Sequence, residues 1–226
     1  MDFLLKFFAN TFVKPFLKFY LRKERSYHYK EFQMVVSPGV FHPGFFFSTT
    51  FLAEFVYALE LKNKKFCEPG TGAGLVSLTA LKKGAMVTAF DINPMAVNNC
   101  NRNWELNRTS FASDSSFEIY TSDLFDNIPL QTFDIIVVNP PYFFGKTSDE
   151  ASKAWYAGEE GEYFEKFFGQ IGNYLHPESK LYMILANNCE LDKIASIAAK
   201  YNFNFSLVQS KKILWEQNSI FRIQKI

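Results

Sequence analysis

Short apolar runs and longer stretches with helical spacing alternate along the chain from residue 64 onward. Runs of four to eight apolar residues are typical of buried strands, and apolar residues that recur every three or four positions are typical of helices. The runs predict strands at Lys64–Glu68, Ala85–Asp91, Ser116–Thr121, Asp134–Asn139, Lys180–Ala186, Asn202–Gln209 and Ser219–Gln224. The helical spacing predicts helices at Thr49–Leu61, Gly74–Lys83, Pro94–Asn107, Glu160–Leu175 and Leu191–Lys200. This alternation predicts an α/β fold built from βαβ units around a parallel sheet.

The first 20 residues are amphipathic. Phe and Leu residues recur near helical spacing, and Lys6, Lys14 and Lys18 fall largely elsewhere on the helical wheel. These lysines interrupt every apolar run well short of the ~18 to 20 residues that a membrane span needs, and no cleavage site of a signal peptide follows. We expect residues 1–39 to form a helical arm, without stable membrane insertion, ahead of one domain over residues 40–226. The arm could pack on the domain, lie on a membrane surface or dock a substrate or partner.

Charge and cysteine content narrow the function classes. The 226 residues include 24 Lys and Arg against 23 Asp and Glu, a net charge of +1. A chain with this balance has no overall field to concentrate a nucleic acid, so RNA or DNA binding would need a local patch. Cys67, Cys100 and Cys189 are too few for a disulfide framework, and they lie in no metal-ligand spacing. We expect a reducing, cytoplasmic compartment and no structural metal.

A glycine-rich turn follows the first predicted strand of the sheet. It contains Glu68, Gly70, Thr71, Gly72 and Gly74. Glycines at such a turn adopt unusual backbone angles and let a ligand lie against the main chain. The spacing differs from the dinucleotide fingerprint and from the phosphate-binding P-loop, and Glu68 would repel a phosphate. The same carboxylate would attract a cationic amino group, which points to a sulfonium nucleoside that carries a methionine moiety.

Two further acids follow the next two predicted strands. Asp91 is placed to accept both hydroxyls of a ribose, as an acid at that position does in nucleotide-binding α/β folds. Asp123 is placed to accept from an adenine amino group, with Ile92 and either Leu124 or Phe125 flanking the ring. The alternative readings are a helix-capping acid for Asp91 and a solvated loop carboxylate for Asp123.

The next predicted strand runs directly into Asn139-Pro140-Pro141-Tyr142. Two prolines stiffen the chain at the strand end and remove backbone donors, so that carbonyl groups are left free. The side-chain oxygen of Asn139 and the carbonyl oxygen of Pro140 could both accept from one NH2 group, while the Tyr142 ring offers a flat face to a planar substrate. The motif therefore indicates an amide or exocyclic amino nitrogen as the target. The alternative is a stiff turn without chemistry.

Together these motifs resemble the class I S-adenosylmethionine-dependent methyltransferases of the Asn-Pro-Pro-Tyr type, most closely the HemK-like release-factor glutamine methyltransferases. The resemblance covers about residues 40 to 226. It includes the stretch from Ala154 to Gly161, and Val40-Phe41-His42-Pro43 followed by Ser48-Thr49-Thr50 looks like the cofactor-covering segment of the same group. It implies a Rossmann-like sheet of seven strands, mostly parallel with an antiparallel C-terminal hairpin and with helices on both faces. About 40 residues ahead of the domain are too few for the helical substrate domain of the bacterial release-factor enzymes.

The resemblance also implies the cofactor and the role of each site residue. S-adenosylmethionine would be held by Glu68, Gly70, Thr71, Gly72, Gly74, Asp91, Ile92, Asp123, Leu124 and Asn139. Catalysis would involve Asn139, Pro140 and Tyr142, and the acceptor would contact Asn139, Pro141, Tyr142 and Trp155.

Three functions remain open from the sequence. The first is N-methylation of a protein glutamine of the release-factor kind. The second is methylation of an RNA or DNA base at adenine N6 or guanine N2, with the base extruded or single-stranded. The third is a cofactor-binding scaffold without catalysis. A release-factor-like protein or an RNA is the expected partner, and a small activating subunit is a further candidate.

Overall fold

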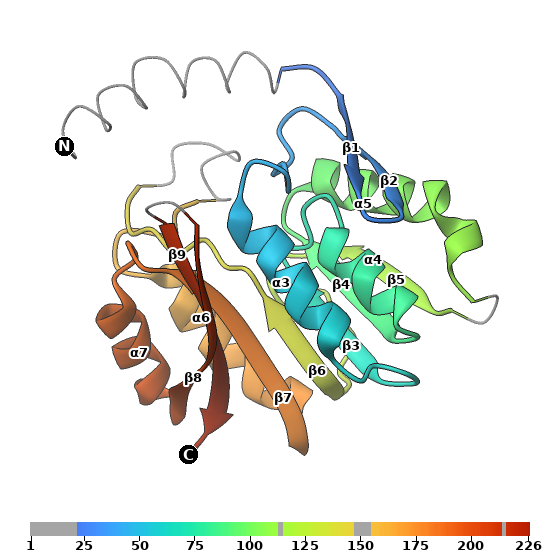
Figure 1. Cartoon of the computed structure of the whole chain (residues 1–226). Coiled ribbons are helices and arrows are strands. Elements are labelled where there is room, and N and C mark those ends of the chain that lie inside the picture. Colours follow the sequence, from blue (N-terminus) through green and yellow to red (C-terminus); the bar gives the residue numbers. More distant parts are fainter. Residues whose placement is uncertain (1–21, 113–114, 147–154, 214–215) are drawn as a thin grey trace.

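The computed structural model describes residues 22–112, 115–146, 155–213 and 216–226 (Figure 1). The strands of the main sheet are β3 (Lys65–Pro69), β4 (Met86–Asp91), β5 (Phe117–Thr121), β6 (Phe133–Val138), β7 (Leu175–Ala186), β8 (Phe203–Ile213) and β9 (Glu216–Lys225). Their order is β5-β4-β3-β6-β7-β9-β8. The strands from β3 to β7 pair in parallel, and β9 is antiparallel to both β7 and β8. The expected seven-stranded sheet with an antiparallel C-terminal hairpin is confirmed.

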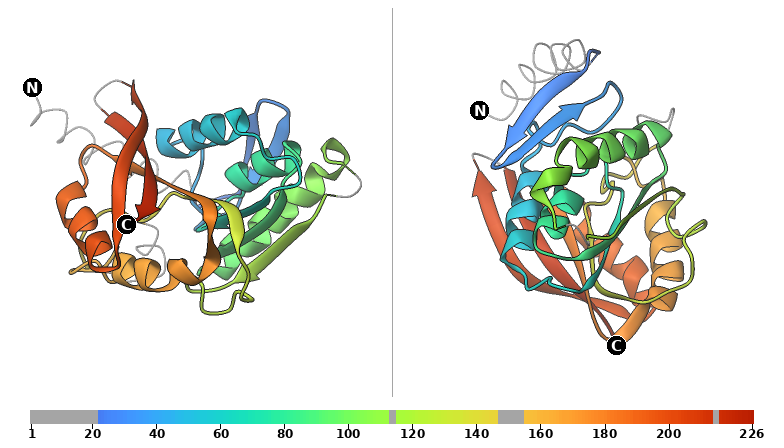
Figure 2. Two further views of the ribbon diagram at one scale, coloured as in Figure 1. Left: turned by 90° about the horizontal axis from the view of Figure 1, so that it is seen from below. Right: turned by 90° about the vertical axis from the view of Figure 1, so that its right-hand side faces the viewer.

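Helices cover both faces of this sheet, as Figures 1 and 2 show. One face carries α3 (Phe47–Ala58), α4 (Leu75–Lys82) and α5 (Pro94–Leu106), and the other carries α6 (Glu162–Ile171) and α7 (Leu191–Lys200). Each of the five predicted helices overlaps one of these five. The prediction of helices on both faces is therefore confirmed.

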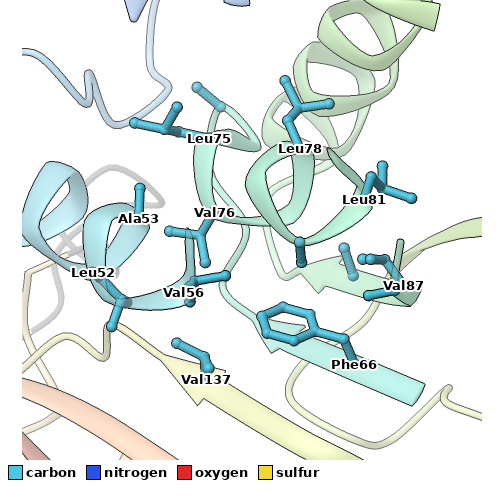
Figure 3. Packing of buried hydrophobic residues seen from close by; sticks show 14 of the residues in the cluster. Leu52, Ala53, Val56, Phe66, Leu75, Val76, Leu78, Leu81, Val87 and Val137 are labelled. Atoms are coloured by element: carbon cyan, nitrogen blue, oxygen red, sulfur yellow. The ribbon is translucent and has the colours of Figure 1, made fainter. Parts of the chain in front are cut away.

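Alternation along the strands explains why the sheet is buried on both sides. In β6, Ile135 and Val137 belong to the apolar cluster under α3, α4 and α5, whereas Ile136 and Val138 belong to the cluster under α6 and α7. Figure 3 shows the first cluster, where Phe66 and Val137 of the sheet lie below the side chains of α3 and α4. Successive strand residues point to opposite faces, so a strand buried on both faces is apolar at every position.

β7 begins earlier than predicted. Leu175 already pairs with Phe133 of β6, and the register then shifts before Ile135 pairs with Lys180. His176-Pro177 lies inside this strand, where the irregular pairing accommodates the proline. The preceding helix correspondingly ends at Ile171 rather than at the predicted Leu175.

The N-terminal segment differs from the expected helical arm. Residues 1–21 of that arm lie outside the described residues. Within the described part, β1 (Arg25–Tyr29) and β2 (Phe32–Val36) form an antiparallel hairpin, so the helical prediction is wrong there. Period-two burial explains the difference, because Phe32, Met34 and Val36 are buried in the main core while the residues between them are not. The boundary between residues 39 and 40 stays a prediction.

A ladder of asparagines attaches this hairpin to α5, which lies beside it in Figure 1. Asn99, Asn103 and Asn107 are almost fully buried on one side of the helix. The N–H groups of three alternate residues, Ser37, Val35 and Gln33, donate to their side-chain oxygens. Four residues of helix rise about 6 Å, close to the span of two strand residues, so a helix can present one amide to every second residue of a strand.

Among the described residues, no helix is long and apolar enough to cross a membrane.

Candidate active site

A cavity of about 640 Å³ opens at the carboxyl ends of β3, β4 and β6. Its volume is in the range of small-molecule sites, and this edge of an open α/β sheet is where ligands generally bind. Thirteen of the site residues singled out in the sequence line it, namely Glu68, Gly70, Thr71, Gly72, Asp91, Ile92, Asp123, Leu124, Asn139, Pro140, Pro141, Tyr142 and Trp155. Gly74 does not line the cavity. The structure thus brings together residues that lie far apart in the chain.

The glycine turn bends back over the end of β4. The N–H groups of Gly70 and Thr71 both donate to the carbonyl oxygen of Phe90, at 2.8 and 3.1 Å. Gly74 has a φ of +89°, and a β-carbon there would lie 2.5 Å from Sγ of Cys100. Both the backbone angle and the close approach of α5 therefore require glycine at this position. Gly74 thus lets the turn pack closely on α5, and its contact with the cofactor stays a prediction.

Glu68 is buried beneath this turn with a raised pKa. Its Oε2 accepts from the hydroxyl of Thr71 at 3.1 Å and from the hydroxyl of Ser77. Burial raises the pKa of the Glu68 carboxyl to about 8, against the opposing effect of the two hydroxyl donors. A cationic group placed in the cavity would favour the charged carboxylate, so the site is electrostatically suited to an ammonium group.

The Asp91 carboxylate accepts hydrogen bonds from the backbone of the glycine turn and from the backbone at the start of α5. Oδ2 accepts from the N–H of Gly72 and Oδ1 accepts from the N–H of Asn93, each at 2.9 Å. Burial raises the pKa of Asp91, while these backbone donors lower it. The side chain of Asn93 separately caps α5 by accepting from the N–H of Met95 at 3.0 Å. Asp91 is thus not the capping residue, and its fixed carboxylate faces the cavity.

Asp123 lies at the far side of the cavity and is paired with a lysine. Its side chain is half exposed, and Oδ2 accepts from Nζ of Lys166 at 2.7 Å. Lys166 also bonds Asp126 at 2.7 Å. Leu124, which is buried, adopts a positive φ of 51° directly after Asp123. The ring of Tyr163 completes this side of the cavity.

Asn139 lies at the end of β6 with its side-chain amide held by α3. Nδ2 donates to Oγ of Ser48 at 3.3 Å and to Oγ1 of Thr49 at 3.4 Å. Both hydroxyl residues also line the cavity. With Nδ2 directed to α3, the oxygen Oδ1 is the end of the amide available to accept from a group in the cavity.

Tyr142, three residues after Asn139, also lines the cavity. Burial raises the pKa of its hydroxyl to about 12, and the Glu216 carboxylate and Cys189 add to the shift. The phenol therefore stays neutral at physiological pH. Tyr142 therefore lies near the end of β7 and the start of β9.

Trp155 lines the cavity and packs against the segment before α3. Its ring centroid lies 5.1 Å from that of Phe41 and 4.7 Å from that of Phe46. The main chain around it returns to the motif, since the N–H of Phe143 donates to the carbonyl of Trp155 at 3.1 Å. Phe41 also approaches the glycine turn, because a β-carbon on Gly72 would lie 3.8 Å from it. Aromatic rings thus line the cavity between the glycine turn and the Asn139-Pro140-Pro141-Tyr142 motif.

Several residues at the site were not singled out in the sequence. Ser77 binds Glu68, Lys166 binds Asp123, and Tyr163 lines the cavity. They come from α4 and α6, and only the packing of helices against the sheet brings them to the strand ends. His42 is buried by contacts with Tyr27 and Phe45, and burial lowers its pKa, so its role is structural. No group of metal-ligating side chains occurs among the described residues.

Comparisons with known proteins agree with this geometry. The family model of the methyltransferase small domain matches residues 31–211. A protein N5-glutamine methyltransferase of Methanocaldococcus jannaschii is 34% identical over 123 residues, which are 52% of this chain and 59% of that protein. A tRNA1(Val) (adenine(37)-N6)-methyltransferase of Shewanella loihica is 29% identical over 151 residues, 63% of this chain and 60% of that protein. A release factor glutamine methyltransferase of Lactococcus lactis is 31% identical over 145 residues, 58% of this chain and 51% of that protein. The chain therefore spans between half and two thirds of the length of these curated relatives.

Solved structures share the fold at low sequence identity. The Mtq2–Trm112 complex of E. cuniculi, responsible for the methylation of the termination factor eRF1, gives a TM-score of 0.60 at 20% identity, over 83% of this chain and 99% of that chain. The 16S rRNA N2 G1207 methyltransferase of T. thermophilus, solved with S-adenosylmethionine and guanosine, gives 0.63 at 18% identity, over 88% of this chain and 50% of that chain. Because the family model covers most of the sequence, the chain belongs to the methyltransferase small domain family of S-adenosylmethionine-dependent enzymes, with the Rossmann-like fold of that class.

Proposed function

We propose that the protein transfers a methyl group from S-adenosylmethionine to a planar amide or exocyclic amino nitrogen, and that this nitrogen belongs to a protein glutamine. The observation that carries the proposal is the held amide of Asn139, whose Nδ2 is bonded to Ser48 and Thr49. An Asn oxygen fixed beside a proline-stiffened carbonyl and a neutral tyrosine ring is an arrangement that accepts from both hydrogens of one NH2 group.

The donor set on the glycine-turn side fits the cofactor. Glu68 would meet the ammonium of the methionine part, and its raised pKa shows a buried acid that a cation would stabilise. Asp91 would accept the ribose hydroxyls. Asp123 would accept from the adenine amino group through Oδ1, since Lys166 uses Oδ2, and Ile92 and Leu124 would flank the ring.

The chain's own residues would supply orientation rather than acid–base chemistry. S-adenosylmethionine, when bound, brings a methyl group already activated by its sulfonium. Asn139 and the Pro140 carbonyl would hold the acceptor nitrogen so that its lone pair is aligned, which favours the transition state over the ground state. Tyr142 stays a neutral phenol and would act as a stacking wall. The departing proton can leave to water after the nitrogen has become cationic.

Protein glutamine is favoured over a nucleic-acid base by the relatives and by charge. Two glutamine methyltransferases are 34% and 31% identical to this chain. The net charge of +1 provides no general attraction for phosphates. The adenine-N6 enzyme of Shewanella loihica, at 29% identity, keeps a base as the second candidate, and the aromatic rings around Trp155 could stack one. The solved complex with Trm112 makes a small activating subunit a candidate partner.

A transfer assay tests this proposal. Tritiated S-adenosylmethionine would be incubated with the protein and with separate release-factor, transfer-RNA and ribosomal-RNA fractions, at low and moderate salt. We expect label in a glutamine of the protein fraction, with only a weak dependence on salt. Label in RNA, with a steep fall as salt rises, would identify the base-methylating alternative. Absence of transfer to every fraction despite cofactor binding would favour the scaffold without catalysis.

A further inference from the structure

The side-chain amide of Asn139 has an accepting atom, Oδ1, and a donating atom, Nδ2, and the proposed function requires Oδ1 to face the cavity. With Oδ1 in the cavity, Asn139 accepts from an NH2 group; with the amide flipped, Nδ2 would face that NH2 group donor to donor. The backbone of β6 places the residue but leaves the final torsion of its amide broad and two-fold. Contacts from outside β6 must therefore hold the amide in place.

We propose that Ser48 and Thr49 are positioning residues, whose hydroxyls hold the side-chain amide of Asn139 at the cavity wall, where it can meet an acceptor nitrogen. The inference rests on the proposed function and adds to it two residues that precede the motif by 91 and 90 positions. Both hydroxyl oxygens lie within hydrogen-bond distance of the same Nδ2 atom, at 3.3 and 3.4 Å.

The place of these two residues on α3 supports a role outside the helix. Ser and Thr near a helix start usually cap it. Here the N-cap position is Phe46, and no side chain caps the helix. Ser48 and Thr49 lie in the first turn and direct their oxygens across to Asn139 instead. Ser48 is only 3% exposed, so water competes little for this contact.

The same turn offers a matched control. The hydroxyl of Thr50 donates back to the carbonyl oxygen of Phe47 at 3.1 Å, within its own helix. Thr50→Val thus removes a hydroxyl of the same helix turn without touching Asn139. Thr49→Val is the isosteric counterpart, and Ser48→Ala removes the second hydroxyl.

The first test is nuclear magnetic resonance of the full chain, which needs no substrate. The two side-chain N–H signals of Asn139 would be assigned by their loss in Asn139→Asp. We expect their exchange with solvent to be at least about tenfold faster in the Ser48→Ala/Thr49→Val double variant than in the wild type or in Thr50→Val. Equal exchange in all three chains would overturn the proposal, whether or not the protein proves to be a methyltransferase.

The second test separates positioning from a structural role. With the acceptor found by the transfer assay, the double variant should lose about 10- to 100-fold in kcat, while the Kd for S-adenosylmethionine stays within about threefold. A loss confined to KM, or an equal loss in Thr50→Val, would contradict the positioning role while leaving the proposed function in place.

Discussion

Replacing Asn103 by alanine tests the asparagine ladder that joins α5 to the N-terminal hairpin. The Asn103 side chain is fully buried and makes three hydrogen bonds. Oδ1 accepts from the N–H of Val35 at 2.8 Å, and Nδ2 donates at 2.9 Å to the carbonyls of both Val35 and Ala73. Its loss would therefore loosen the hairpin and the glycine turn at once.

The magnitude follows from the number of bonds removed. A typical intramolecular hydrogen bond contributes about 0.5 to 1.5 kcal/mol net, so three bonds are worth about 3 kcal/mol. Alanine regains up to about 0.7 kcal/mol of helix propensity, which leaves a loss of about 2 to 3 kcal/mol. For a domain of this size, each kcal/mol lowers the Tm by about 2 to 4 °C, so we expect a decrease of about 4 to 12 °C.

Asn101 provides the control for this experiment. It lies on the same helix but is exposed, and Asn101→Ala should leave the Tm unchanged or raise it slightly. Thermal unfolding followed by circular dichroism would compare the two variants. If Asn103→Ala unfolds within about 2 °C of the wild type, or if Asn101→Ala is equally destabilised, the ladder does not stabilise the hairpin.

The remaining predictions concern the cavity. Asp91→Ala should weaken S-adenosylmethionine binding at least about 100-fold in calorimetry, and an unchanged Kd would remove Asp91 from the cofactor site. The folded-state pKa of Glu68 is raised to about 8, so the contribution of this group to stability is present below its ordinary pKa of 4.5 and is lost as the pH rises toward 8. Between these two pH values the free energy of unfolding of the ligand-free protein should fall by up to about 1.4 kcal/mol per pH unit. The same slope in Glu68→Gln would refute this assignment to Glu68. Gly74→Ala should destabilise the fold by about 2 to 4 kcal/mol in urea unfolding, with partial recovery in Cys100→Ala, which removes the close sulfur but not the positive φ. Trp155→Ala should raise the KM for the acceptor with a smaller effect on the Kd of S-adenosylmethionine, and the reverse pattern would place Trp155 on the cofactor.

The sheet and the cavity floor could be predicted because their signals are local. β3, β4 and β6 are apolar at successive positions, and each ends in a short polar or glycine-rich motif. Parallel strands bring such ends to one edge, so Glu68, Asp91 and Asn139 could be placed together without coordinates. Their roles toward a cofactor and an acceptor are predictions that the experiments above test.

The hairpin was missed because a stronger pattern precedes it. The amphipathic spacing of the first 20 residues favoured a helix and was extended over residues that alternate with period two. The short strand β2 gains its stability from burial in the core and from the amides of α5. Such contacts between distant segments leave only a faint signal in the sequence, namely three asparagines at four-residue spacing on a helix that disfavours them.

The helix residues that bond to the predicted site residues could not be predicted for a similar reason. Lys166 lies on α6, and Ser48 and Thr49 lie on α3, far in sequence from Asp123 and Asn139. Spacing along the chain does not report which helix face meets which strand end. The interpretation of Asp123 as a solvated loop acid is partly supported, since it is half exposed but paired with Lys166.

One measurement addresses the central claim, that Asn139 orients an acceptor nitrogen for methyl transfer and does not hold the cofactor in place. Wild-type protein and Asn139→Ala, each saturated with tritiated S-adenosylmethionine, would be mixed with the acceptor fraction, and transfer in a single turnover would be counted beside the bound cofactor. We predict cofactor binding within about threefold in the two chains and loss of transfer in the variant. Transfer by Asn139→Ala at nearly the wild-type rate would contradict the account.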